Sequence, residues 1–200
     1  MMATNPQRLF MTEAEYLAFE RASEVKHEYW EGEVVAMSGG TVEHNRLGFK
    51  MAFLLEEQLG SGDPCRVYTS DMRVLVAKNK YVYPDVTVSC DVSDHQPGND
   101  VVHSPHIVVE VISLSTEATD RGKKLIWYQN HPTIEEYVLI NTRVQLVEVY
   151  QRGQKGEPWS YRTYHTGQMI ELRSLDLTMA FNELYANLRI PLLAEELEGN

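Results

Sequence analysis

Apolar residues that recur every three or four positions mark the helices of this chain. The clearest case runs from Val42 to Leu59 and is followed by Gly60, a residue that suits a helix end. Thr12 and Glu15 have the spacing of a capping box, which predicts the start of a shorter helix. We expect four helices, at about residues 12–21, 42–59, 115–130 and 181–188.

The segments between these helices contain short apolar runs that alternate with polar or turn residues, as β-strands do. Glu31-Gly32 and Lys78-Asn79-Lys80 each separate two such runs, so each is expected to form the turn of a hairpin. The expected strands are residues 29–30, 34–37, 72–77, 81–90, 106–113, 135–140, 144–150, 159–164 and 169–172. This order of elements indicates an α/β or α+β domain around one central mixed sheet.

A length of 200 residues suits one domain with a well-buried core. Since no repeat or linker divides the chain, we expect a single domain over residues 1–200, with its core at about 12–190 and an acidic tail at 191–200. The content of 43% hydrophobic and 24% charged residues is typical of a soluble globular protein. No apolar stretch is long enough to span a bilayer, so we expect no membrane partner.

Two features favour a cytoplasmic location. Residues 1–11 lack the basic start and apolar run of a secretory signal. Cys65 and Cys90 have no metal-ligand spacing, and Cys90 ends an apolar strand. We therefore interpret both cysteines as reduced packing residues.

The formal net charge of −11 disfavours tight, sequence-independent binding to a nucleic-acid duplex, which normally needs a basic surface. The acidic residues crowd the first forty positions and the C-terminal tail. Between Arg121 and Lys155, in contrast, basic residues outnumber acidic ones. The sequence is therefore compatible with a local basic face on an acidic body.

One strand carries a carboxylate in its middle. Glu110 lies within the apolar run from His106 to Ser113, and an ionised Glu is rarely buried without a partner. Asp85, on the preceding strand, points away from the apolar face of that strand, and it could meet Glu110 if the two strands pair. Such oxygen ligands suit Mg²⁺ or Mn²⁺. Spacing alone nevertheless favours a simpler interpretation, in which Asp85 belongs to a turn and Glu110 bonds a buried arginine or hydroxyl group.

The helix after this strand offers a basic group. Asp120, Lys124 and Tyr128 are four residues apart and share one helix face, whereas Lys123 lies on a neighbouring stripe. A lysine beside a metal-bound water could orient that water or stabilise charge on a phosphate. Without further information, an exposed Asp120–Lys124 ion pair is the simpler interpretation.

Several motifs occur together in one order: Gly32-Glu33-Val34, Tyr83-Pro84-Asp85-Val86, Val109-Glu110-Val111-Ile112-Ser113, Asp120-Arg121-Gly122-Lys123-Lys124 and Tyr137-Val138-Leu139. In this combination, residues 29–150 resemble the Uma-type restriction endonuclease family, a branch of the PD-(D/E)XK nuclease superfamily. The resemblance implies a restriction-endonuclease-like core, with a central mixed β-sheet flanked by helices and a metal site at one end of the sheet.

By this resemblance, Asp85 and Glu110 correspond to the two metal-binding acids. The superfamily usually places a lysine two residues after the second acid, but Ile112 occupies that position here. The resemblance therefore assigns the lysine to the following helix, where Lys124 matches best and Lys123 remains an alternative. Glu28, His44 and Asp120 are accessory candidates, and Asp120 lies on the same helix as the two lysines. For Glu28 and His44, a solvated strand-end charge and a surface or packing residue are the simpler interpretations.

The function that the resemblance implies is a Mg²⁺- or Mn²⁺-dependent endonuclease that hydrolyses the phosphodiester bonds of nucleic acid, with DNA as the expected substrate. In that function Asp85, Glu110 and Lys124 are catalytic, and Asp85 and Glu110 hold the metal. A homodimer is also expected by analogy with double-strand cutters, and the hairpin of Trp159-Ser160-Tyr161 could support it. The alternative is a non-catalytic module that keeps the nuclease fold for binding or scaffolding, which the net acidity and the displaced lysine favour.

Overall fold

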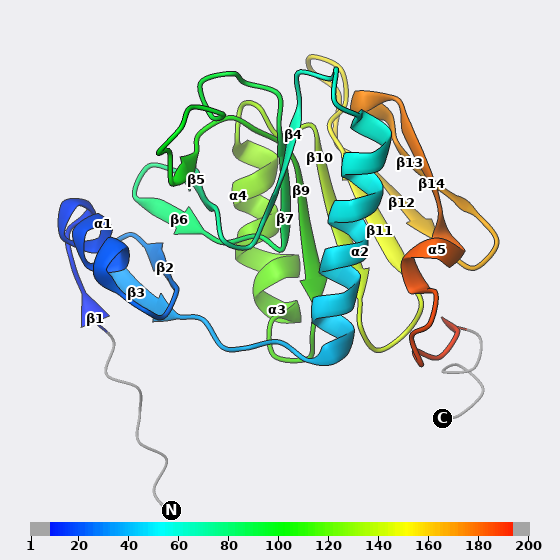
Figure 1. Ribbon diagram of the computed structural model, residues 1–200, viewed down its shortest axis with the longest axis horizontal. Coiled ribbons are helices and arrows are strands. Elements are labelled where there is room, and N and C mark those ends of the chain that lie inside the picture. The colour runs from blue at the N-terminus through cyan, green and yellow to red at the C-terminus, as the bar shows by residue number, and fades with distance from the viewer. Residues whose placement is uncertain (1–8, 194–200) are drawn as a thin grey trace, which may run out of the picture.

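The structure is a computed structural model that describes residues 9–193 (Figure 1). Most of the acidic tail expected at 191–200 lies outside these residues. The described part of the chain forms an α+β fold with two large sheets, which confirms the expected fold class. No helix within residues 9–193 is long and apolar enough to cross a membrane.

A central mixed sheet of six strands organises the molecule. Its order is β12-β11-β10-β9-β7-β4, with β9 and β10 parallel and all other neighbours antiparallel. The strands are β4 (Arg66–Thr69), β7 (Val86–Ser89), β9 (Pro105–Ile112), β10 (Glu136–Asn141), β11 (Val147–Gln151) and β12 (Ser160–Tyr164).

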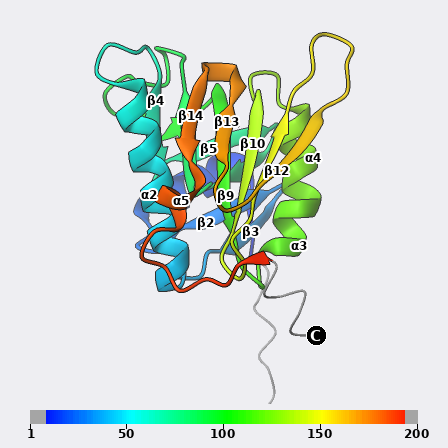
Figure 2. The same ribbon diagram turned by 90° about the vertical axis from the view of Figure 1, so that its right-hand side faces the viewer.

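Helices cover both faces of the central sheet, as Figure 2 shows with α2 (Val42–Leu59) and α4 (Leu125–Asn130) on opposite sides. Strand β9 alternates between these faces as its sequence predicts. Val109 and Val111 pack in the core under α2. The ribbon of β13 (Met169–Leu172) and β14 (Leu177–Ala180) and the helix α5 (Phe181–Tyr185) belong to the same core. A short 3₁₀ turn at Arg173–Leu175 joins the two ribbon strands. Val108 and Ile112 pack in the core on the α4 side. Glu110 has the parity of the second set, so its carboxylate enters the core beside α4.

A second sheet lies beside the first and carries the N-terminal elements. Its order is β1-β3-β2-β6-β5-β8, and α1 (Glu13–Ala22) packs on it through Tyr16, whose ring stacks on Tyr29 at 4.7 Å. The capping box of Thr12 and Glu15 is confirmed. The strands are β1 (Leu9–Phe10), β2 (His27–Trp30), β3 (Glu33–Ala36), β5 (Arg73–Ala77), β6 (Lys80–Val82) and β8 (Val101–Val102). The two sheets share a core with α4, and this arrangement brings β2 toward the central sheet.

The expected strand 81–90 is wrong as a single element. It is two strands, β6 in the second sheet and β7 in the central sheet, separated by Tyr83-Pro84-Asp85. Pro84 has no N–H to donate to a ladder, so the pairing stops there and the chain passes from one sheet to the other. The break leaves Asp85 at the junction of the two sheets.

The expected helix 115–130 exists but is not α-helical throughout. It consists of α3 (Glu117–Thr119), a π-helical turn (η1, Asp120–Lys124) and α4. The π-turn contains both Asp120 and Lys124, and it places them in the interior at 2% and 6% exposure. The interpretation of an exposed Asp120–Lys124 pair is therefore wrong.

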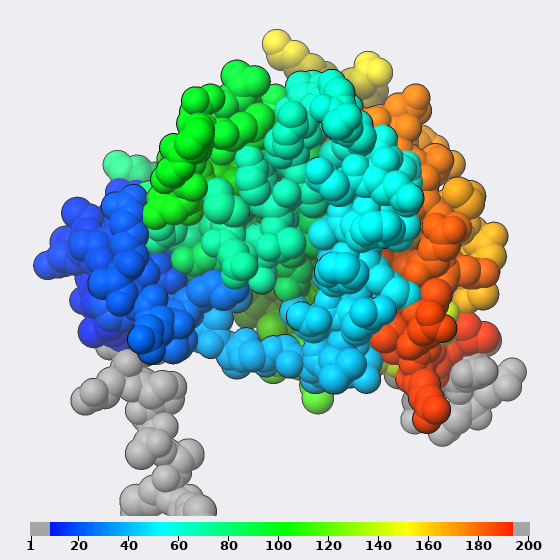
Figure 3. Space-filling view, in the orientation of Figure 1, coloured from blue at the N-terminus to red at the C-terminus, as the bar shows by residue number. Residues whose placement is uncertain are grey.

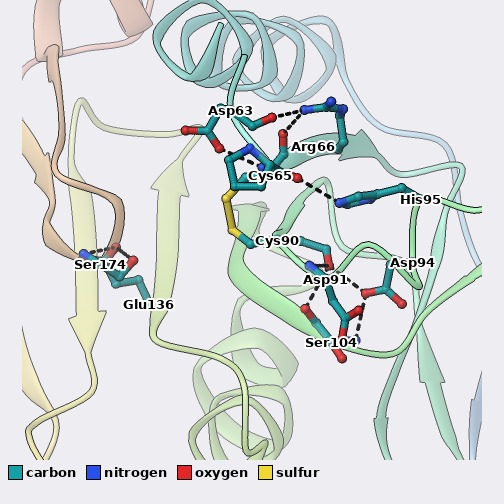
Figure 4. Close-up of a disulfide and its surroundings, with 12 residues drawn as sticks. Asp63, Cys65, Arg66, Cys90, Asp91, Asp94, His95, Ser104, Glu136 and Ser174 are labelled. Atoms are coloured by element: carbon teal, nitrogen blue, oxygen red, sulfur yellow. Dashed lines mark hydrogen bonds between the residues drawn. A yellow bond between two sulfur atoms is a disulfide. The ribbon is translucent and has the colours of Figure 1, made fainter. Parts of the chain in front are cut away.

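The expectation of two reduced cysteines is also wrong, because Cys65 and Cys90 form a disulfide (Figure 4). The ladder between β4 and β7 pairs Arg66 with Ser89, so the two cysteines are the next opposed residues beyond it. Strand pairing over 25 residues of sequence brings them together, and sequence spacing does not reveal it. The disulfide removes the argument by which reduced cysteines indicated a cytoplasmic location.

Candidate active site

A cavity of about 740 Å³ opens where the two sheets, the start of α2 and the π-turn meet. The titratable residues that line it include Glu28 of β2, His44 of α2, Asp85 between β6 and β7, Glu110 of β9, and Asp120 and Lys124 of the π-turn. In the space-filling view the surface is hollowed between the N-terminal elements and the start of α2 (Figure 3). The segment between β3 and α2, residues 37–41, forms one wall.

Lys124 is the centre of the buried part of this cavity. Its Nζ lies 3.0 Å from Glu110 Oε1, 3.0 Å from Glu28 Oε1 and 3.4 Å from Asp120 Oδ1. The hydroxyl of Tyr128 also donates a hydrogen bond of 2.6 Å to Glu110 Oε1. The lysine side chain is 8% exposed, so these contacts form largely without solvent screening. One ammonium group therefore holds three carboxyl groups from three different elements.

The electrostatics of this group are unbalanced. Burial raises the pKa of Glu110 well above its usual value, although Lys124 acts in the opposite direction. Burial also raises the pKa of Asp120. For Lys124 itself, burial acts to lower the pKa, but the acids around it, Glu110 first, outweigh burial and raise the pKa well above its usual value. Three carboxyl groups around one ammonium favour either a proton on Glu110 or the arrival of a further cation.

Asp85 forms the other side of the site. Its Oδ2 accepts a hydrogen bond of 2.7 Å from the backbone N–H of Val111, the residue after Glu110. The same oxygen lies 3.4 Å from His44 Nε2. Because Val111 is bonded to Glu110, this hydrogen bond fixes the Asp85 carboxylate against the strand that carries the second acid.

His44 reaches Asp85 because of the way α2 begins. Thr41 is the N-cap, and its Oγ1 accepts a hydrogen bond of 3.3 Å from the backbone N–H of His44. This cap places His44 in the first turn of the helix, at the cavity, with its side chain 23% exposed. The contact with Asp85 raises the pKa of His44, against the opposite effect of burial. His44 is thus neither a surface residue nor a simple packing residue.

The structure also separates the two lysines. Lys123 Nζ lies 5.4 Å from the centre of the Trp30 ring, on the outer side of the helix, and Lys123 is exposed. Lys124 is the lysine that meets the acids. Glu28 is 6% exposed, so the interpretation of a solvated strand-end charge is wrong.

Two further residues of the site were not assigned a role from the sequence. Tyr128 donates to Glu110, and the backbone N–H of Tyr83 donates to Glu28 Oε1 at 3.4 Å. The contact of Tyr128 with Glu110 could have been predicted, because Tyr128 lies four residues after Lys124 and so shares its helix face. The contact of Tyr83 depends on the pairing of β2 with β6, which sequence periodicity does not give.

The donor set of the cavity fits a hard divalent cation. Within residues 9–193 no group of three or more His, Cys, Asp or Glu side chains has the arrangement of a preformed metal centre. Mg²⁺ does not require one, since it is commonly held by one or two carboxylates with waters and phosphate oxygens. Asp85 and Glu110 line the same cavity and supply carboxylate oxygens of this kind. The excess of acidic groups around Lys124 also favours a cation there.

A crystal structure from Anabaena variabilis, described as a putative nuclease belonging to DUF820, has a similar fold. The TM-score is 0.68, with 16% sequence identity over 82% of this chain and 91% of that chain. Two relatives from Synechocystis, named uncharacterized proteins slr1290 and sll1609, are each 33% identical to the chain described here. The first alignment covers 94% of this chain and 99% of the relative, and the second covers 71% and 81%.

A family model described as "Uma2: Putative restriction endonuclease" matches residues 13–187. The match extends from α1 to the residues after α5 and includes every side chain of the cavity named above. Together with the identity to the two Synechocystis proteins, this match shows the family. The chain belongs to the Uma2 family of putative restriction endonucleases.

Proposed function

We propose that this protein is a divalent-metal-dependent endonuclease that hydrolyses phosphodiester bonds in nucleic acid, with DNA as its substrate. The observation that carries the proposal is the meeting of Asp85, Glu110 and Lys124 in one cavity. The family description and the nuclease description of the structural neighbour support it.

In this proposal Asp85 and Glu110 hold Mg²⁺ or Mn²⁺. When bound, the ion supplies Lewis-acid polarisation of the scissile phosphate and lowers the pKa of the attacking water. The hydrogen bond from the Val111 N–H orients Asp85 for this task, and the hydroxyl of Tyr128 orients Glu110. Both carboxylates are thus fixed before any cation arrives, which reduces the reorganisation that binding requires.

Lys124 and His44 are the groups that handle charge and protons. The ammonium of Lys124 stabilises negative charge that develops on the phosphate, and it can orient a water molecule through a hydrogen bond. Glu28 and Asp120 keep that ammonium charged and in place. The contact with Asp85 raises the pKa of His44, which makes this imidazole the candidate group for donating a proton to a phosphate oxygen or to the leaving group.

The proposal also accounts for an acidic protein that acts on a polyanion. With a net charge of −11, the body of the protein repels nucleic acid at long range. A divalent cation held by the two acids would offset most of the negative charge of the cavity and would attract a phosphate group there. We therefore expect substrate binding, and not only cleavage, to require the metal.

Calorimetric titration of Mn²⁺ combined with a cleavage assay tests this function. We compare the wild-type protein with Asp85→Asn, Glu110→Gln and Lys123→Gln, and we use both duplex and single-stranded DNA. The two acid variants should lose the binding heat and lower cleavage by about 100-fold or more. Lys123→Gln is the matched control, because this lysine is adjacent in sequence but lies outside the group of acids, and it should keep both properties.

Two results would contradict the proposal. Metal binding without cleavage of any DNA or RNA by the wild-type protein would favour a non-catalytic binding module. Cleavage that persists in Asp85→Asn or Glu110→Gln would show that the chemistry occurs elsewhere. Circular dichroism of each variant establishes whether the fold persists, so a loss of structure is not counted as a loss of function.

A further inference from the structure

Helix α2 carries a stripe of exposed residues on the side that faces away from the core, and three of these residues are apolar. Val42 is 71% exposed, Phe49 is 60% exposed and Phe53 is 56% exposed. Two exposed phenylalanines one turn apart are unusual on a helix whose opposite face already fills the core. Figures 1 and 3 show α2 in cyan at the front of the molecule.

The stripe has the spacing of a coiled-coil seam. Val42, Arg46, Phe49, Phe53 and Glu56 follow one another at intervals of four, three, four and three residues. This alternation keeps a line of side chains facing a partner helix. All five residues are exposed, so the whole line is accessible along most of the 18-residue helix.

The charges at the two ends of the stripe are complementary under a two-fold axis. An antiparallel copy of α2, related by an axis at the level of Met51, would place Phe49 against Phe53 of the second copy. The same axis would place Arg46 against Glu56 of the second copy. A parallel arrangement would instead oppose Arg46 to Arg46 and Glu56 to Glu56, which is repulsive. The pattern therefore fits a second copy of this chain in the antiparallel orientation.

The two charged residues are available for such contacts. Arg46 lies over the Phe49 ring, 6.0 Å from its centre, so its guanidinium stays beside the aromatic centre of the stripe. Among residues 9–193, neither Arg46 nor Glu56 forms an ion pair. Both charges would gain a partner in the antiparallel pair.

We propose that two copies of this protein associate through the α2 stripe, defined as Val42, Arg46, Phe49, Phe53 and Glu56, in an antiparallel and isologous dimer. Four phenylalanine rings form its centre, and two Arg46–Glu56 pairs flank them. Helix α2 lies apart from β12, the strand that contains Ser160 and Tyr161, as Figure 2 shows. The stripe is also independent of the proposed chemistry, because no residue of the stripe is one of the acids, the lysine or the histidine of the cavity.

Sedimentation velocity over a range of protein concentrations tests the dimer. The variants are Arg46→Glu, Glu56→Arg, the double variant with both changes, and Phe49→Asp. Ile126→Asp is the matched control, because Ile126 is an apolar residue of another helix with a similar exposure of 58%. Each single charge reversal turns two attractive pairs into two repulsive ones, so the dimer dissociation constant should rise about tenfold or more. Phe49→Asp should give a monomer, and Ile126→Asp should leave the dimer intact.

The double variant is the decisive sample. It restores two opposite-charge pairs in swapped positions, so its dissociation constant should return toward that of the wild-type protein. A wild-type protein that is monomeric at all concentrations overturns the proposal. A dimer that resists both Phe49→Asp and the single charge reversals overturns it as well, because the interface then lies elsewhere. None of these readouts depends on metal or cleavage, so failure here is distinguishable from failure of the proposed chemistry.

Discussion

Lys124 determines the electrostatic balance of the candidate site at the scale of single residues. A buried carboxylate is stable only when its charge is compensated. Glu28, Glu110 and Asp120 all depend on this one ammonium group. Replacing the whole cluster of Lys124 and its three acids by apolar residues would cost little stability. The presence of this cluster in a cavity is therefore more consistent with a chemical role than with a role in folding. The same reasoning gives a clear stability prediction.

Lys124→Met should lower the free energy of unfolding by about 3–5 kcal/mol, because it leaves three acidic groups in the interior without a cation. Lys123→Met is the matched control. Its side chain is exposed and its Nζ lies over the face of Trp30, so the change should cost less than about 1 kcal/mol. Urea denaturation of both variants and the wild-type protein, without metal, measures the difference. Equal effects of the two substitutions would contradict the central position given to Lys124.

The π-turn is the feature of most interest at the scale of elements. A π-turn adds a residue to a helix relative to α-helical geometry, and such turns occur often at functional sites. Here the turn joins α3 to α4 and brings Asp120 and Lys124 into the interior. Gly122 lies in its middle, and a Cβ built there would have no heavy atom within 4 Å outside its own helix. The structure therefore has room for a larger side chain at this position.

Gly122→Ala should raise the free energy of unfolding by about 0.5–1 kcal/mol, because alanine restricts the unfolded chain and favours helical backbone. Gly153→Ala is the contrasting control. A Cβ at Gly153 would lie 2.5 Å from the backbone oxygen of Pro158, so that variant should be destabilised. Urea denaturation again provides the measurement. A destabilised Gly122→Ala protein would mean that the turn needs the conformational freedom of glycine.

The elements also show what the sequence could and could not predict. The helix 42–59 was predicted with its observed bounds, because its apolar period and its glycine end are local signals. The alternation in 106–112 likewise predicted the side on which Glu110 lies. The split of 81–90 was missed because alternation continues across Pro84, although a proline without an N–H interrupts the ladder. The π-turn was missed because it keeps the i, i+4 relation of Asp120 and Lys124 that an α-helix also predicts.

At the scale of the whole molecule, the candidate site depends on the way the two sheets meet. Glu28 comes from the second sheet, Glu110 comes from the central sheet, and Asp85 lies in the segment that joins them. Such long-range pairings are set by tertiary packing and leave little local signal in the sequence. The motifs and the family resemblance nevertheless singled out Asp85 and Glu110, which the structure places in one cavity, whereas the contacts of Glu28 and His44 required the three-dimensional arrangement.

The disulfide is a second consequence of this long-range pairing, and it supports the edge of the central sheet. It joins Cys65, just before β4, to Cys90, just after β7, and α2 packs against both strands. Closing a loop over a sequence separation of 25 residues restricts the unfolded chain and should contribute about 3 kcal/mol to stability. The double variant Cys65→Ala, Cys90→Ala should lose about that free energy of unfolding.

Reductant provides the control for this prediction. It should destabilise the wild-type protein by the same amount and should leave the double variant unchanged, as urea denaturation with and without reductant can show. Mn²⁺ binding should persist in the double variant, because Asp85 is held by the N–H of Val111 and the disulfide lies at the far end of β7. If reductant has no effect on the wild-type protein, the two cysteines are thiols in solution. Loss of metal binding in the double variant would instead mean that the edge of the sheet and the cavity are coupled through β7.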